Sequence, residues 1–113
     1  MAYDEKLAER VRDVLAGEEG VSERKMFGGI AFMVDGHMAC GIVGDDLMVR
    51  LGAEGAEEAL GRAHVRPMDF TGRPLTGMVY VEPAGVRGAV LGDWVRRAAA
   101  HARSLPRKES KRR

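Results

Sequence analysis

The sequence has little of what catalytic and metal-binding sites are usually built from. Its 113 residues include one cysteine, three histidines and one tryptophan. A single cysteine excludes a disulfide within the chain and a zinc site made of four cysteines from one chain. The longest apolar runs are a few residues, far below the ~20 that a membrane-spanning helix needs, and no apolar leader segment follows Met1. We therefore expect a cytoplasmic protein that makes no contact with a membrane.

An excess of charge of either sign is also missing, because 18 basic and 17 acidic residues give a net charge of +1. The balance hides an uneven distribution. Residues 103–113 hold six basic residues and one acidic residue, which leaves residues 1–102 with a net charge of −4. Together with 45% hydrophobic residues, this indicates one globular domain over residues 1–104 and a basic, flexible tail over residues 105–113.

The basic tail has two interpretations. Basic tails bind nucleic acid by displacing counterions from phosphates, whereas many chain ends are simply solvated. If the tail binds nucleic acid, the contacts come from its five outermost basic residues: Arg107, Lys108, Lys111, Arg112 and Arg113.

Residue spacing predicts the regular elements. Asp4 is a suitable N-cap for a first helix, and residues 30–34, 37–43 and 47–51 read as three strands separated by turn residues such as Asp35-Gly36. A short helix is expected over residues 54–60. Two further strands are expected over residues 65–70 and 78–81, with a turn at residues 71–74 between them. A final helix carries one apolar stripe: Val90, Leu91, Trp94, Val95, Ala98, Ala99 and Ala102.

The order of these elements is α-β-β-β-α-β-β-α. Tight turns cannot join parallel strands, which need a long crossover between them. The sequence therefore predicts an α+β domain of two layers, with a mainly antiparallel five-stranded sheet and the helices on one face.

Catalytic motifs are missing from this framework. Neither G-x-x-x-x-G-K-[ST] nor G-x-G-x-x-G occurs. His37 and Cys40 are three residues apart on a predicted strand, so we expect their side chains on opposite faces, which disfavours a metal pair or a nucleophilic dyad. Cys40 reads as a small buried apolar residue, and His64 and His101 are isolated. We predict no catalytic residue, no metal and no cofactor.

Basic and methionine side chains are the candidates for binding. Seven methionines are many for this length, and interior packing is the default for them, although Met48 shares a strand face with Arg50. The sheet arginines either bind an acidic partner or a phosphate, or form ion pairs with Asp69 and Glu82 on a solvated face. The candidate residues for binding a partner are Arg24, Lys25, Met48, Arg50 and Arg73.

Two segments resemble one protein family. Arg24-Lys25-Met26-Phe27-Gly28-Gly29, followed by an apolar strand and Asp35-Gly36, is similar to the N-terminal domain of the TfoX/Sxy family. Residues 67–74 (Pro-Met-Asp-Phe-Thr-Gly-Arg-Pro) and 77–81 (Gly-Met-Val-Tyr-Val) resemble a later segment of that domain, and the likeness covers about residues 3–104. The resemblance implies helices on one side of an antiparallel sheet, as in type III secretion chaperones. It also implies a role in regulating competence genes, and it supplies no catalytic residue.

Three hypotheses about function stay open. The first is a small, non-enzymatic regulatory or adaptor domain that binds an unidentified protein. Dimerisation through the sheet or the final helix is a variant of it, with Met48 and Trp94 as contacts, although Trp94 fits the core equally well. The second is a weak nucleic-acid binder that uses the tail and the sheet arginines. The third is a small-molecule binder or enzyme whose site only the folded chain assembles.

Overall fold

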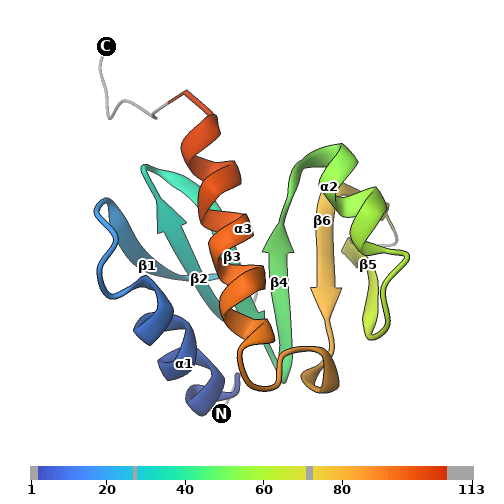
Figure 1. The fold of residues 1–113 in the computed structure, drawn as a ribbon, viewed down its shortest axis with the longest axis horizontal. Helices are drawn as coiled ribbons and strands as arrows, with labels where there is room; N and C mark the ends of the chain where they lie inside the picture. Colours follow the sequence, from blue (N-terminus) through green and yellow to red (C-terminus); the bar gives the residue numbers. More distant parts are fainter. Residues whose placement is uncertain (1–2, 27, 71–72, 107–113) are drawn as a thin grey trace.

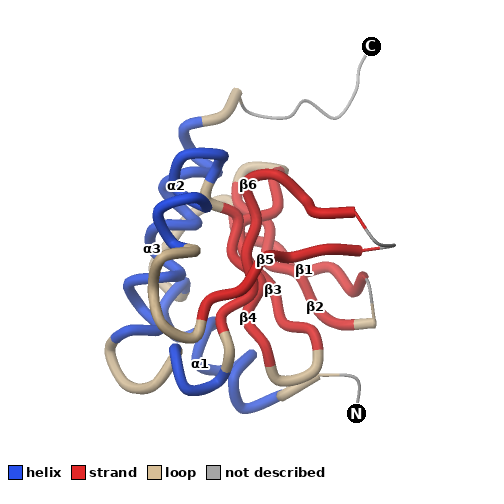
Figure 2. The backbone as a smooth tube through the Cα atoms, turned by 90° about the vertical axis from the view of Figure 1, so that its right-hand side faces the viewer, coloured by secondary structure: helices blue, strands red, loops and turns tan. Residues whose placement is uncertain are grey.

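The chain folds into two layers, a six-stranded sheet and a layer of helices on one of its faces (Figures 1 and 2). The computed structural model describes residues 3–26, 28–70 and 73–106. In chain order the elements are α1 (Glu5–Leu15), β1 (Val21–Met26), β2 (Gly29–Val34), β3 (His37–Val43), β4 (Asp46–Arg50), α2 (Gly52–Ala59), β5 (Val65–Phe70), β6 (Arg73–Val81), the 3-10 turn η1 (Pro83–Gly85) and α3 (Val90–Ser104).

The sheet is antiparallel throughout, with strand order β1-β2-β3-β4-β6-β5. This confirms the α+β class and the placing of the helices on one face. The sheet has six strands rather than the five expected, because β1 precedes the predicted meander. The predicted turn at residues 71–74 lies partly outside the described residues, and residues 73 and 74 belong to β6.

The strand that the sequence did not reveal is the most polar one in the sheet. β1 reads Val-Ser-Glu-Arg-Lys-Met, and its residues 22–25 are exposed. It is an edge strand, and within the described part of the chain it pairs with β2 and no other strand. Among its side chains at residues 21–25, only that of Val21 packs against the main core. A strand is recognised in a sequence by the alternation of apolar and polar residues. A strand that is held mainly by backbone hydrogen bonds to its neighbour lacks this alternation.

Two local predictions are confirmed by backbone geometry. The Asp4 carboxylate accepts hydrogen bonds from the backbone N–H groups of Lys6 and Leu7 at 3.0 and 3.2 Å, which caps α1. Asp35 and Gly36 both have positive φ, at 53° and 86°. That pair of angles belongs to the two-residue turn whose twist suits a hairpin.

The main core lies between the sheet and α1 and α3. The apolar stripe of α3 is buried against β3 and β4 except for Val90, which is 48% exposed at the start of the helix. Trp94 is only 3% exposed, so it is a core residue. The Trp94 Nε1–H donates to the Gly85 carbonyl oxygen at 3.2 Å. The guanidinium carbons of Arg62 and Arg97 lie 5.4 and 5.3 Å from the ring centroid, and both arginines pair with Glu58.

A bulge in β3 corrects one prediction. The β2–β3 register shifts after Phe32, so that Phe32 faces Cys40 while Val34 faces His37. Phe32 and Val34 both point into the main core, and directly opposed residues share a face of the sheet. His37 and Cys40 therefore lie on the same, helix-covered face rather than on opposite faces, because the extra residue reverses the alternation between them.

Close backbone approach at Gly41 generates a testable prediction. A Cβ at this buried position would lie 2.6 Å from the Ile30 carbonyl oxygen and 2.5 Å from Met48 Cε. We expect Gly41→Ala to lower the free energy of unfolding by about 1–3 kcal/mol, because the backbone atom cannot move aside as a side chain can. Urea denaturation followed by circular dichroism measures the change.

Gly17 supplies the matched control for this substitution. It lies beyond α1 with no atom within 4 Å of an added Cβ and no positive φ. We expect Gly17→Ala to change the unfolding free energy by no more than about 0.5 kcal/mol. Equal effects of the two substitutions on the unfolding free energy would show that close packing around Gly41 does not make an added Cβ destabilising there.

Candidate functional site

The described residues offer little catalytic chemistry. None of them form a group of three or more histidine, cysteine or carboxylate side chains that would hold a metal ion. Cys40 is completely buried, and burial raises the pKa of its thiol to about 12. A thiol that stays protonated at neutral pH is a poor nucleophile, so Cys40 is a packing residue.

The three histidines are spread over the molecule. His64 is exposed with a φ of 68°, and His37 Nε2 lies 2.5 Å from the Pro106 carbonyl oxygen. His101 packs against Gly52. Its pKa is lowered by burial and then by the positive charges of Arg50 and His37. Among the described residues no hydrogen bond joins a histidine to Cys40, so no nucleophile–base pair is assembled.

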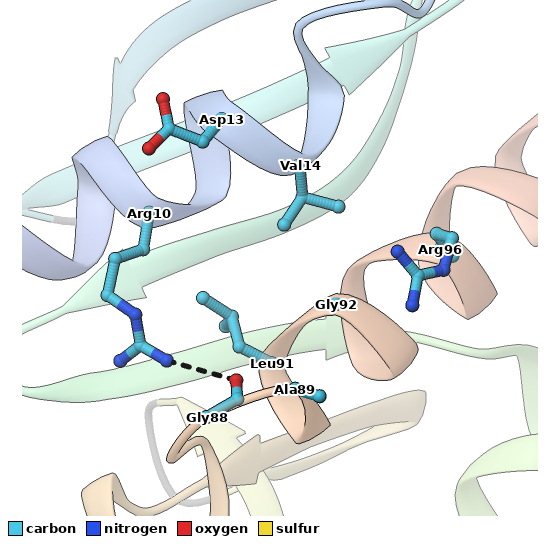
Figure 3. Close-up of a pocket in the computed structure, with 8 residues that line it drawn as sticks. All are labelled: Arg10, Asp13, Val14, Gly88, Ala89, Leu91, Gly92 and Arg96. Carbon is cyan, nitrogen blue, oxygen red and sulfur yellow. Dashed lines mark hydrogen bonds between the residues drawn. The ribbon is translucent and has the colours of Figure 1, made fainter.

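A groove separates α1 from the first turns of α3. Figure 3 shows its lining, and its volume is about 360 Å³. Val14 and Leu91 supply apolar surface, while Arg10 and Arg96 contribute guanidinium groups. Arg10 is already engaged, because it donates hydrogen bonds to the carbonyl oxygens of Val86 at 2.8 Å and Gly88 at 3.3 Å. Arg10 therefore ties α1 to the loop before α3, and Asp13 is the one carboxylate among the described residues that line the groove.

No helix of residues 3–26, 28–70 or 73–106 covers the opposite face of the sheet (Figure 2), which is built around one cross-strand row. The registers place Arg24, Ala31, Gly41, Met48, Tyr80 and Arg66 directly opposite one another in turn, from β1 to β5. The row thus has an arginine at each end and small or apolar residues between. We call this surface the helix-free face.

Methionines concentrate on the helix-free face. Met48 and Tyr80 form a small separate cluster with Val43 and Met78 packed against it, and the registers place Met33 and Met38 on the same face. Met48 is 0% exposed, with its Cε over Gly41. It therefore does not fit the expectation of an exposed partner contact. Interior packing is thus confirmed for Met48, whereas Met33, Met38 and Met78 are half-buried, and the main core of the described residues contains no methionine.

Arg66 takes the ion-pair alternative that the sequence left open. It bonds to the Asp46 carboxylate, its Nε lies 3.3 Å from a Glu82 oxygen, and its guanidinium carbon lies 4.5 Å from the Tyr80 ring centroid. Burial raises the pKa of Asp46, an effect that Glu82 and Asp45 add to and Arg66 opposes. Because Arg66 lies over the Tyr80 ring, that face of the ring is not open to a stacking base.

The basic pair on β1 is different, because it is exposed and unpaired. The side chains of Arg24 and Lys25 form no ion pair or hydrogen bond with any described residue. Their neighbour Glu23 is paired, because its carboxylate accepts hydrogen bonds from Nε and Nη2 of Arg12 at 2.7 and 3.0 Å. That hydrogen bond lowers the pKa of Glu23 and raises the pKa of Arg12. The basic edge is the name we use for β1 with these two cations.

The remaining candidates are placed as follows. Arg50 is half-buried at the end of β4 and has no ion pair among the described residues. The backbone of Arg73 pairs with that of Phe70, while the Arg73 side chain lies outside what is described. The candidates in the tail also lie outside the described residues: Arg107, Lys108, Lys111, Arg112 and Arg113.

The fold and these surfaces define a small α+β domain with helices on one face, a methionine-lined face opposite and a basic sheet edge. A family model, the TfoX N-terminal domain, matches residues 13–102. The chain therefore belongs to the TfoX N-terminal domain family, which makes it a domain of regulatory type. Neither the curated proteins nor the solved structures contain a match. In the described part of the chain, every helix is too short or too polar to cross a bilayer.

Burial of Cys40 leads to a prediction about thiol reactivity and pH. We expect the native thiol to stay unmodified by Ellman's reagent at pH 8, and one thiol per chain to react after unfolding in urea. The pKa rises from 9.0 for the free group to about 12 in the fold. The stability that the neutral thiol contributes is therefore complete below pH 9 and is lost as the pH rises toward about 12.

Cys40→Ala separates this effect from the titration of other groups. Urea unfolding at pH 8 and pH 10 should give a smaller loss of stability with pH in the variant than in the unchanged chain. Fast reaction of the native thiol at pH 8 would contradict the buried, protonated state.

Proposed function

We propose that this chain is a non-enzymatic regulatory domain of competence or transcriptional type that acts in the cytoplasm by binding another protein through its basic edge. The observation that carries the proposal is the pair Arg24 and Lys25, both exposed and both without an ionic partner among the described residues. Membership of the TfoX N-terminal domain family supports the regulatory role.

The charge around the basic edge supports its use as a binding surface. Arg24 belongs to the helix-free face, and Lys25, opposite Ile30, points to the helix-covered side, so cations flank both sides of the edge. Glu23 is neutralised by Arg12. The edge is therefore positive on a body whose sequence has a net charge of −4, an asymmetry that orients an acidic partner during encounter.

Nucleic-acid binding stays a prediction of the sequence. It depends on the tail, which lies outside the described residues, and on the sheet arginines. Arg66 is engaged by two carboxylates and covers Tyr80, which leaves the described side chains of the helix-free face without an open aromatic ring on which a base stacks. We therefore rank protein binding first.

An affinity capture from the cells of origin tests the proposal. The tagged chain is compared with the double variant Arg24→Glu/Lys25→Glu, with and without nuclease, and bound proteins are quantified by mass spectrometry. We expect a specific protein that survives nuclease and is reduced about tenfold in the double variant, the loss that 1.4 kcal/mol of binding free energy produces.

The matched control is Lys6→Glu/Arg87→Glu, which makes the same change in net charge at two exposed cations without ionic partners among the described residues. It should keep the captured protein. A partner that disappears with nuclease would favour nucleic-acid binding. Equal losses in both double variants would mean that overall charge, not the basic edge, determines binding.

A further inference from the structure

The outer side of β1 presents unused backbone hydrogen-bonding groups. The Gly20 carbonyl accepts the Asp35 N–H at 3.0 Å, so it points toward β2. In a trans peptide the next N–H, that of Val21, points the opposite way. Strand alternation then turns the N–H and C=O groups of Val21, Glu23 and Lys25 away from β2. No hydrogen bond among the described residues uses them.

The other edge of the sheet is less suited to accept a strand. β5 contains Pro67, which has no N–H to donate, and its register with β6 shifts between Pro67 and Asp69. Proline and bulges are the usual devices that close an edge to further pairing. β1 has neither a proline nor a register shift in its pairing with β2.

We infer that β1 binds an extended acidic segment of a partner protein, which joins the sheet as a seventh strand. The inference rests on the proposed function and names the chemistry of the partner. Main-chain hydrogen bonds to Val21, Glu23 and Lys25 provide the pairing, as in other cases of strand addition. The cations on the edge select the charge of the added strand.

Positions of the two cations specify where the acidic residues belong. Arg24 and Lys25 are adjacent, so their side chains point to opposite faces of the sheet. A segment with two consecutive carboxylates places one on each face, beside one cation each. Cross-strand pairs of opposite charge stabilise sheets by roughly 0.2–1 kcal/mol each, so two such pairs discriminate against neutral or basic segments.

A second copy of this chain fits the edge less well. Antiparallel self-pairing through the outward groups has two registers of greatest overlap. One places Glu23 opposite its own copy, and the other places Arg24 opposite its own copy, where like charges are destabilising. The second register also brings Glu23 near Lys25 of the other copy, but Glu23 is already held by Arg12.

Repulsion between like charges also disfavours the chain's own tail as the strand that pairs with β1. Residues 107–113 hold five basic residues and one acidic residue. Pairing them with the edge would set like charges against Arg24 and Lys25.

A labelled peptide of sequence Thr-Val-Glu-Glu-Val-Thr-Val is the probe, and Thr-Val-Lys-Lys-Val-Thr-Val is its control. Binding to the full chain is measured by fluorescence anisotropy, and amide shifts and hydrogen exchange by NMR. We expect the acidic peptide alone to bind, and to slow exchange of the amides of Val21, Glu23 and Lys25 more than those of Ser22 and Arg24, which are already paired within the sheet.

Two substitutions at one position separate backbone pairing from charge. Lys25→Gln removes the charge and keeps the outward N–H, and we expect it to weaken binding several-fold. Lys25→Pro removes both, and we expect a further loss of about tenfold, while the β1–β2 ladder is kept because this N–H points outward. Arg87→Glu, remote from the edge in sequence and exposed, should leave affinity unchanged.

The outcomes that overturn the inference are distinct. Equal affinities of Lys25→Gln and Lys25→Pro, where thermal unfolding shows both folded, would leave only charge recognition without strand addition. In the unchanged chain, hydrogen exchange of the outward β1 amides that stays fast with the peptide bound would also exclude strand addition. Self-association in sedimentation experiments that Lys25→Pro abolishes would make a second copy the occupant.

The capture experiment keeps this inference and the proposed function apart. A captured protein together with a peptide that leaves the β1 amides unaffected would sustain the function and overturn strand addition. Peptide binding at β1 without any captured protein would sustain the edge chemistry and overturn the function.

Discussion

Burial of one face of the sheet by α3 is the constraint on which the rest of the structure depends. α3 packs against β3 and β4 and also against α1, so one helix joins both layers. Trp94 is buried on this helix, with its N–H satisfied by the Gly85 carbonyl and its ring covered by Arg62 and Arg97. Helices on one side only leave the second face of the sheet to be covered by its own side chains.

The helix-free face is covered from within the sheet. Met48 fits over Gly41, and Arg66 lies over Tyr80 while pairing with carboxylates on β4 and after β6. These contacts remove the central apolar atoms from solvent. On β1, by contrast, outward backbone groups and two adjacent exposed cations have no partner among the described residues. This is why we place recognition at the edge rather than at the groove between α1 and α3.

Part of the candidate site was predictable from the sequence, and part was not. The sequence showed a basic segment at Arg24-Lys25. Gly28, which follows β1, has a φ of 76° and is the kind of turn residue that indicates a hairpin. The polar pattern of β1 concealed that this segment is a strand. Met48 looked available because it shares a face with Arg50, and only the packing over Gly41 shows that it is buried.

Local chemistry in the sequence by itself determined the helices, the hairpin turns, the α+β class and the family, because caps, apolar stripes and positive-φ residues act over a few positions. The tertiary structure alone decided the sixth strand, the shared face of His37 and Cys40, and the partners of Arg12 and Arg66. Each of these depends on register between strands or on contact between elements distant in sequence. A shift of one residue in register exchanges the faces of a strand, and such a shift leaves no mark in the sequence of that strand.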